Sequence, residues 1–274
     1  MKKIALLFSL LCFGTTLLCA QDWIHLGTGL GVDKIRMAVP DFHASTPPDV
    51  TKAFNETLWN DLESAGIFEM VSKSFYPLQT PGSPREFNSG AWGNPPPNAA
   101  MVAFGNLALQ GGSVTMQGWL FEAKNPTSPQ VLGKQYRETG NSEGARTAAH
   151  KFADEIIFRL GGGINGIAQS KIVYVCGGGG HKEICEMDYD GANQHRLTHL
   201  GTIALSPRIS PDGSRVAFSA LARTSWEIMM YSRTLGRMVS FPHYGGTNLS
   251  PAWSPNGSLA FSSSRSGDPE IYIT

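Results

Sequence analysis

The sequence has little charge and no excess of either sign. Among its 274 residues, 22 lysines and arginines balance 22 aspartates and glutamates, and charged residues make up only 16% of the chain. Proteins that bind nucleic acid or an anionic membrane surface through electrostatics carry a basic excess. We therefore expect no such partner, and a protein or a small molecule fits this composition better.

Long apolar runs are absent after the first residues of the chain. Two lysines precede the apolar run Ile4–Leu18, and a small residue, Ala20, follows Cys19. This pattern predicts a signal peptide over residues 1–20, cleaved after Ala20, and hence export. A membrane anchor fits less well because the run of about 15 residues is shorter than the roughly 20 that span a bilayer. A lipidated Cys19 also fits less well, since the large Leu18 precedes it.

Cysteine is scarce, with four residues in all, and two of them lie in the predicted signal peptide. The other two, Cys176 and Cys185, flank the glycine-rich loop Gly177–Lys182 on two predicted strands. An oxidising compartment permits a disulfide between them, and free thiols are the alternative. A metal site that includes His181 is the third reading, but a fourth ligand is missing and four glycines would hold ligands poorly.

A repeat of short strands fills the C-terminal part of the chain. Each copy has an apolar strand followed by a Glu-Ile step, and the copies are 44 and 43 residues apart. The strands are Lys171–Val175, Arg215–Ser219 and Ser258–Ser262, and the steps begin at Glu183, Glu227 and Glu270. A period of this length predicts β-propeller blades, in which each sheet buries its faces against its neighbours.

Matching turns support this interpretation. Ser210–Gly213 and Ser254–Gly257 precede the second strand of their units, and each combines proline, Asp or Asn, and glycine in the order that a hairpin corner needs. A β-sandwich is the alternative, but sandwiches need no fixed repeat. Only two and a half units are present, whereas propellers close with about four to eight. Because the third unit stops inside a strand at Thr274, we expect a truncated chain.

The residues between the signal and the repeats predict a separate domain. Strands and two amphipathic helices are expected over Ile35–Val39, Asp49–Leu62, Phe68–Val71, Met101–Leu109, Ser113–Phe121, Val131–Tyr136 and Glu143–Leu160. The fold class is thus an α+β N-terminal domain, with a mixed sheet and two helices, followed by an all-β, incomplete β-propeller. The domains are 21–168 and 169–274, with a boundary at Gly161–Gly166. The long segment Phe75–Asn98 is expected to be a surface insertion held down by Phe87 and Trp92.

Several motifs suggest chemistry, but none fits its context. Gly140–Gly144 matches a Gly-x-Ser-x-Gly nucleophile elbow, yet no downstream strands carry the acid and histidine that such hydrolases need. We expect Ser142 to be a helix N-cap, Asp49 to cap the earlier helix, and His150 to be half-exposed and structural. Asp188–Asn193 lacks the distal ligands of a calcium loop and fits a turn between strands. We expect no catalytic residue, cofactor or metal site, and no enzymatic activity.

Four segments together resemble the TolB family, the periplasmic components of the Tol-Pal envelope system. They are Arg146–Ile156, Lys171–Val175, Met187–Asn193 and Leu205–Gly213. The resemblance covers essentially the whole mature chain and is closest from Arg146 onward. It implies a monomeric, non-enzymatic adaptor in the periplasm that supports outer-membrane integrity and cell division. The implied partners are the peptidoglycan-associated lipoprotein and, through the mature N-terminus, TolA; the membrane would be reached only through these partners.

The segment that matches the family's TolA-binding tail is about Gln21 to Val32, although its amino-acid sequence differs from that of the usual tail. The candidate partner-binding residues in it are Gln21, Asp22, Trp23, Ile24, Gly29, Gly31 and Val32. Loops such as Gly177–Lys182 and Leu221–Ser225 would present further side chains at the rims of the propeller. Two rival readings stay open. One is the propeller part of an exported peptidase of the prolyl-oligopeptidase or tricorn type, and the other is a ligand-binding propeller that uses Trp226 and Trp253.

Overall fold

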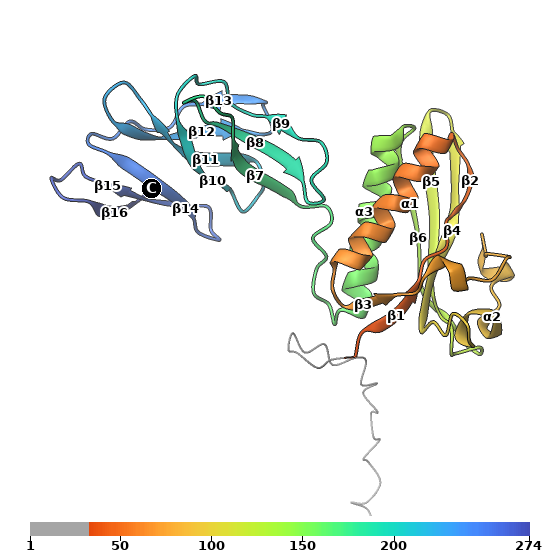
Figure 1. Ribbon diagram of the computed structural model, residues 1–274. Coiled ribbons are helices and arrows are strands. Elements are labelled where there is room, and N and C mark those ends of the chain that lie inside the picture. The colour runs from red at the N-terminus through yellow and green to blue at the C-terminus, as the bar shows by residue number, and fades with distance from the viewer. Residues whose placement is uncertain (1–32) are drawn as a thin grey trace, which may run out of the picture.

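The computed structural model describes residues 33–274 (Figure 1). The N-terminal part is one mixed six-stranded sheet of order β3-β1-β4-β5-β6, in which β2 also pairs with β4. The strands are β1 Ile35–Ala38, β2 His43–Ser45, β3 Phe68–Met70, β4 Met101–Gln110, β5 Ser113–Glu122 and β6 Gln130–Thr139. Strand β1 pairs in parallel with β3 and β4, and β2 pairs in parallel with β4, whereas β4, β5 and β6 form an antiparallel meander. The predicted mixed sheet is confirmed, and only the short β2 was missed.

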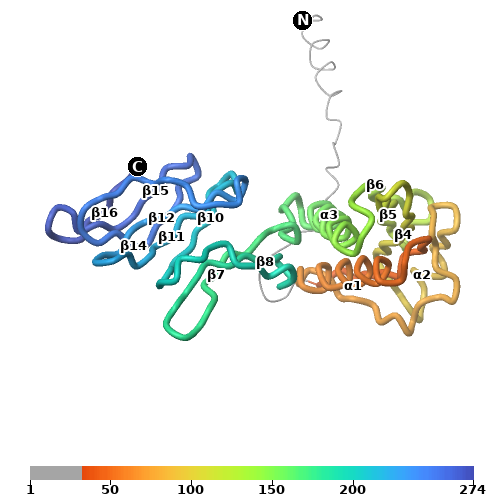
Figure 2. Tube along the Cα trace, turned by 90° about the horizontal axis from the view of Figure 1, so that it is seen from above, coloured from red at the N-terminus to blue at the C-terminus, as the bar shows by residue number. Residues whose placement is uncertain are grey.

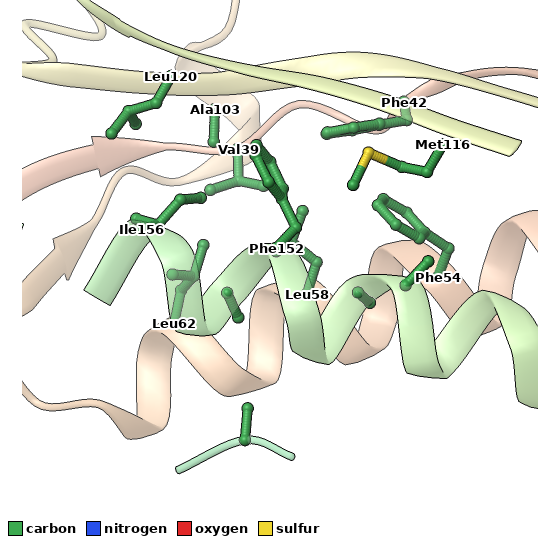
Figure 3. Packing of buried hydrophobic residues seen from close by; sticks show 14 of the residues in the cluster. Val39, Phe42, Phe54, Leu58, Leu62, Ala103, Met116, Leu120, Phe152 and Ile156 are labelled. Atoms are coloured by element: carbon green, nitrogen blue, oxygen red, sulfur yellow. The ribbon is translucent and has the colours of Figure 1, made fainter. Parts of the chain in front are cut away.

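Two helices, α1 Pro48–Ser64 and α3 Ser142–Leu160, lie side by side on one face of this sheet (Figures 1 and 2). Their apolar faces are fully buried, as at Phe54 and Phe152, and they pack onto strand residues such as Met116 (Figure 3). The sheet leaves room for them at Gly118, where an added Cβ would lie 2.8 Å from the Phe152 ring. This shared core fixes the exposed side of α3, which faces the second part of the chain.

The opposite face of the sheet is covered by the long segment 75–98, which includes the short helix α2 Ser89–Gly93 and the 3₁₀ turn Pro84–Glu86. Trp92 is 1% exposed and packs edge-on against Tyr76, with ring centroids 5.1 Å apart. Phe87 stacks on Phe104 of β4 at 5.3 Å. The insertion is therefore held by its own aromatic residues, as the sequence predicted.

Both predicted helix caps are wrong by one or two positions. Helix α3 is capped by Asn141, whose Oδ1 accepts a hydrogen bond of 2.9 Å from the Gly144 backbone N–H. Ser142 lies in the first turn instead, and its hydroxyl donates to Asp49 of α1 at 3.0 Å. Asp49 is likewise inside α1, which begins after Pro47. The two residues thus join the helix starts to each other rather than capping them.

The C-terminal part consists of three antiparallel sheets, of order β7-β8-β9, β10-β11-β12-β13 and β14-β15-β16. The strands are β7 Lys171–Cys176, β8 Glu183–Asp188, β9 His195–Arg196, β10 Ala204–Ile209, β11 Arg215–Leu221, β12 Trp226–Ser232, β13 Arg237–Val239, β14 Asn248–Trp253, β15 Leu259–Ser263 and β16 Glu270–Ile273. Equivalent strands carry the sequence repeat, and equivalent bulges place Ser206 and Ser250 at φ values of 54° and 56°.

The three sheets stack face to face (Figure 1), as blades do. Phe218 of β11 lies in a buried cluster with Ile184 of β8. Its neighbour in the strand, Ala217, points to the opposite face of the sheet and lies in a buried cluster with Phe261 of β15. The middle sheet therefore buries one face against each neighbour. This confirms an incomplete propeller and excludes one continuous sandwich. Within residues 33–274, no helix combines the length and apolarity needed to cross a bilayer.

Candidate protein-binding site

The two parts of the chain meet at a polar junction between helices α1 and α3 and the turn after β8. We call this cluster the junction; its members are Asp61, Glu143, Arg146, His150, Lys171, Asp188, Asp190 and Asn193. Arg146 Nη2 donates to Asp190 Oδ2 at 2.5 Å, and Asn193 Nδ2 donates to Glu143 Oε1 at 2.8 Å. Side chains from α3 thus hold the first sheet of the propeller against the N-terminal domain.

His150 lies at the centre of the junction, where only 6% of its surface is exposed. Its Nδ1 is 2.7 Å from Asp61 Oδ2, and its Nε2 faces Asp190 Oδ2 at 3.9 Å without a hydrogen-bond partner. The expectation of a half-exposed histidine is therefore wrong. The polar face of α3, which the sequence pattern predicts to be exposed, is buried at this position because the C-terminal part of the chain covers it.

Burial shapes the titration of the acids at the junction. Desolvation raises the pKa of Asp61, and it outweighs the opposing hydrogen bond and charge of His150. Desolvation also opposes ionisation of Asp190, but hydrogen bonds from the Ala192 backbone N–H and from Arg146 outweigh it and lower the pKa of that carboxyl. The charged form of Asp190 is thus the one that the junction stabilises.

The junction also brings together the ligand types of a metal site, since atoms of His150, Asp188 and Asp190 lie within 4.8 Å of one another. However, two cations already neutralise these acids. Lys171 forms an ion pair with Asp188, and the Arg146 guanidinium lies 2.5 Å from Asp190 and 3.9 Å from Asp188. A divalent ion here would face this positive charge at close range, so the donor set does not fit a metal site.

A second contact fixes the glycine-rich linker after α3. Asp154 Oδ1 accepts a hydrogen bond of 2.8 Å from the Ala168 backbone N–H, and Asp154 Oδ2 accepts from the backbone and side chain of Gln169 at 3.2 and 2.9 Å. The linker passes so close that a Cβ added to Gly166 would lie 2.1 Å from Asp154 Oδ1. The direction in which the chain enters the propeller is therefore set by one carboxylate.

The hydroxyl of Ser142 donates to Asp49 of α1 and not to a histidine. The nearest histidine on the same helix, His150, is engaged with Asp61. The nucleophile-elbow motif therefore lacks the serine–histidine contact that activates such a hydroxyl.

Three equivalent loops, each of which follows the first repeated strand of its sheet, form one rim of the propeller. They are 177–182 between β7 and β8, 222–225 between β11 and β12, and 264–269 between β15 and β16. Strand β8 runs from the first of these loops to Asp188 at the junction. The rim therefore lies at the opposite end of the strands from the N-terminal domain, where it is open to a partner.

Cys176 and Cys185 lie beside the first rim loop, with Cα atoms 5.9 Å apart and their sulfur atoms in bonding contact. A disulfide between them stays a prediction until thiols are counted on the purified protein. The predicted partner-binding residues Gln21, Asp22, Trp23, Ile24, Gly29, Gly31 and Val32 lie outside the described residues.

Nothing in the local sequence indicated the junction. Arg146–Ile156 and Met187–Asn193 are separated in the chain, and each alone fits a helix or a turn. The one signal in the sequence was that both segments carry the family resemblance. Neither Arg146 nor Asp190 is needed to form the helix or the turn in which it lies. Their contact supplies a reason for both.

Comparison with known proteins agrees with this architecture. A family profile described as the TolB beta propeller domain matches residues 159–274. The Tol-Pal system protein TolB of Desulfosudis oleivorans is 28% identical over 280 residues, which cover 99% of this chain and 62% of that protein. A TolB homolog of Chlorobium luteolum is 32% identical and covers 77% of this chain and 47% of its own length.

The crystal structure of TolB from Acinetobacter baumannii has the same fold, with a TM-score of 0.72 at 21% identity over 89% of this chain and 58% of that one. This chain spans between 38% and 62% of the length of the curated TolB relatives that it matches. Residues 159–274 therefore belong to the TolB β-propeller domain family, and the chain is similar to a TolB protein over 99% of its length.

Proposed function

We propose that this protein is a non-enzymatic scaffold of the Tol-Pal envelope system in the periplasm. The observation that carries the proposal is the family match over residues 159–274, together with a relative named as a Tol-Pal system protein that aligns with 99% of the chain. The role we infer is protein binding in support of outer-membrane integrity and cell division.

The scaffold would act by presenting loops on a rigid frame. Stacked sheets with shared buried clusters hold the strands, and the junction holds the first sheet against the N-terminal domain. Loops on such a frame lose little conformational freedom when a partner binds, which favours affinity. The chemistry of the described residues fits this role, because the acids and bases of the junction neutralise one another.

The proposed partners are the peptidoglycan-associated lipoprotein, at the propeller, and TolA, at residues 21–32. Both proposals rest on the family, because the chain spans only part of the length of its relatives. The membrane would be approached through these partners. If the signal peptide is cleaved after Ala20, the mature chain begins at Gln21. N-terminal sequencing of the protein from a periplasmic extract tests this.

Binding of the purified mature chain to the soluble domain of the lipoprotein, measured by calorimetry, tests the proposal. We expect saturable binding that an unrelated periplasmic protein does not show. A folded chain that does not bind the lipoprotein would contradict this part of the proposal. Binding of a peptide with the sequence of residues 21–32 to TolA tests the second partner separately.

A fluorophosphonate probe for activated serines tests the absence of catalysis. We expect no labelling at Ser142, because its hydroxyl donates to Asp49 rather than to a histidine. Stoichiometric labelling of the wild-type protein that disappears in Ser142→Ala would show a nucleophile and overturn the non-enzymatic assignment.

A further inference from the structure

The rim of the propeller carries one exposed basic side chain on each of its three equivalent loops. These are Lys182 in loop 177–182, Arg223 in loop 222–225 and Arg265 in loop 264–269. We call these three residues the basic rim. The first two loops lie side by side, because the Lys182 backbone N–H donates to the Thr202 carbonyl at 2.9 Å and the Thr202 hydroxyl donates to the Leu221 carbonyl at 2.9 Å. The third loop is the equivalent connection in the sheet that packs on the other side of the middle one.

The three cations of the basic rim have no acidic partner among the described residues, a property that they share with Arg196, Arg208, Arg215 and Arg237. Within residues 33–274, no carboxylate oxygen lies within 4.0 Å of the charged nitrogens of Lys182, Arg223 or Arg265. Arg233, in contrast, donates to Glu186 of the neighbouring sheet at 2.6 Å. Exposed acids are present on the third loop and after it, at Asp268 and Glu270, but Glu270 accepts from the Tyr272 hydroxyl at 3.3 Å.

Arg265 is held in place by two aromatic rings. Its guanidinium carbon lies 3.8 Å from the centroid of the Tyr272 ring and 5.5 Å from that of Tyr244. Tyr244 packs in turn on the buried Phe261, at 5.1 Å between centroids. Stacking fixes the plane of a guanidinium while its N–H groups stay available at the edge, so less entropy is lost when they bind a carboxylate.

We propose that the basic rim is a recognition surface for acidic side chains of a protein partner, with Arg265 as its anchor. The inference deepens the proposed function and rests on it for the identity of that partner. A carboxylate matches the edge of a guanidinium with two parallel hydrogen bonds, and arginine and tyrosine are among the residue types enriched at binding hot spots. Lys182 and Arg223 add attraction that steers an acidic surface to the rim.

The test uses two probes, an acetylated octapeptide of glutamate and the same peptide made of glutamine, with the full mature chain. We expect the wild-type protein to bind the glutamate peptide more tightly, by a factor on the order of five, and added salt to weaken that preference. Arg265→Ala should remove most of the preference. Arg265→Lys, which keeps the charge but not the planar stack, should retain only part of it.

Arg159→Ala is the matched control, because Arg159 is an exposed arginine in the last turn of α3, in the N-terminal domain and outside the rim loops. This variant should leave the preference unchanged. Equal binding of the two peptides by the wild-type protein, or an unchanged preference in a folded Arg265→Ala variant, would overturn the proposal.

The soluble domain of the lipoprotein forms the second arm, with the same four proteins. Loss of its binding in Arg265→Ala but not in Arg159→Ala would support the rim as the surface for that partner. If the wild-type chain prefers the glutamate peptide but ignores the lipoprotein, the proposed function fails and the rim stands. If it binds the lipoprotein without preferring glutamate, the rim fails and the function stands.

Discussion

The junction and the basic rim differ in how their charged side chains are paired. At the end near the N-terminal domain, Arg146 and Lys171 each have a carboxylate partner, and Asp188 is only 5% exposed. At the other end, Arg223 and Arg265 are exposed and have no ion pair within residues 33–274. The same residue type therefore serves structure at one end and remains available to a ligand at the other.

This difference follows from burial. A charge that loses water must be paired, because leaving it alone costs several kcal/mol. An exposed charge keeps its water and contributes little to folding, so it is free to respond to a partner. Substitutions at the junction should accordingly lower the free energy of unfolding, whereas substitutions in the basic rim should weaken binding and leave that free energy nearly unchanged.

The largest effect is expected at the junction. Arg146→Ala removes the guanidinium that pairs with Asp190 and also lies 3.9 Å from the buried Asp188, so we expect a loss of about 2–4 kcal/mol in the free energy of unfolding. Urea denaturation followed by circular dichroism measures it. Arg223→Ala is the control at the other end and should change that free energy by no more than about 0.5 kcal/mol. Equal losses in the two variants would remove the distinction between the ends.

The next effect is expected at the rim end itself, where the pair Cys176 and Cys185 joins β7 to β8 across a separation of 9 residues. A disulfide closing a loop of this length stabilises by about 2–3 kcal/mol in the chain-entropy account. The double variant Cys176→Ser, Cys185→Ser should lose that amount under oxidising conditions. Wild-type protein with reductant should match it, and a free-thiol assay should find no reactive thiol before reduction. Two thiols in the untreated protein would contradict the disulfide.

A smaller effect is expected in the linker. Gly166→Ala would place a Cβ 2.1 Å from Asp154 Oδ1 and 2.6 Å from Asp154 Cα, so the linker must shift away from α3 and release the Ala168 and Gln169 amides from the carboxylate. We expect a loss of about 1–2 kcal/mol and a change in the distance between the domains by small-angle scattering. Gly178→Ala in the first rim loop is the matched control, since nothing lies within 4 Å of the added carbon. No difference between these two variants would mean that Asp154 does not fix the linker.

Much of this architecture could be predicted from the sequence because its signals are local. The repeat of strands, the apolar face of α3 and the turns each depend on residues a few positions apart, and the structure has them where they were expected. The short β2 carries no such signal, since three exposed residues form a strand only because β4 lies beside them. The cap of α3 also escaped prediction, because Asn141 and Ser142 are both good cap residues and only the backbone distinguishes them.

The candidate sites were less accessible to sequence reasoning. His150 and Asp190 are brought together by the docking of two parts that fold around separate cores, and no spacing in the sequence encodes that docking. The stacking of Arg265 likewise needs Tyr244 and Tyr272 from two other elements. Rim loops were expected to present side chains to a partner, but only the structure shows that Arg265 is held in place by two aromatic rings.

The smallest effect compares two equivalent turns. The hydroxyls of Ser210 and Ser214, and the Ser214 backbone N–H, bond to Asp212 and lower the pKa of its carboxyl from 3.8 to about 2. The matching position in the next sheet is Asn256, which accepts the Ser258 N–H at 3.1 Å and does not titrate. Since the folded pKa of Asp212 is depressed, its stabilisation is present above pH 3.8 and is lost as the pH falls toward about 2.

Asp212→Asn should therefore lower the urea midpoint slightly near pH 6, and the difference from wild type should shrink toward about pH 2.5. Asn256→Asp is the reciprocal variant, and it should raise the midpoint near neutral pH with the same acid dependence. The effect must be small because the carboxyl of Asp212 is exposed and screened by water. A difference that stayed constant over this pH range would show that shape, not charge, distinguishes the two turns. The paired charges of the junction would then be the one electrostatic contribution to stability among the four predictions.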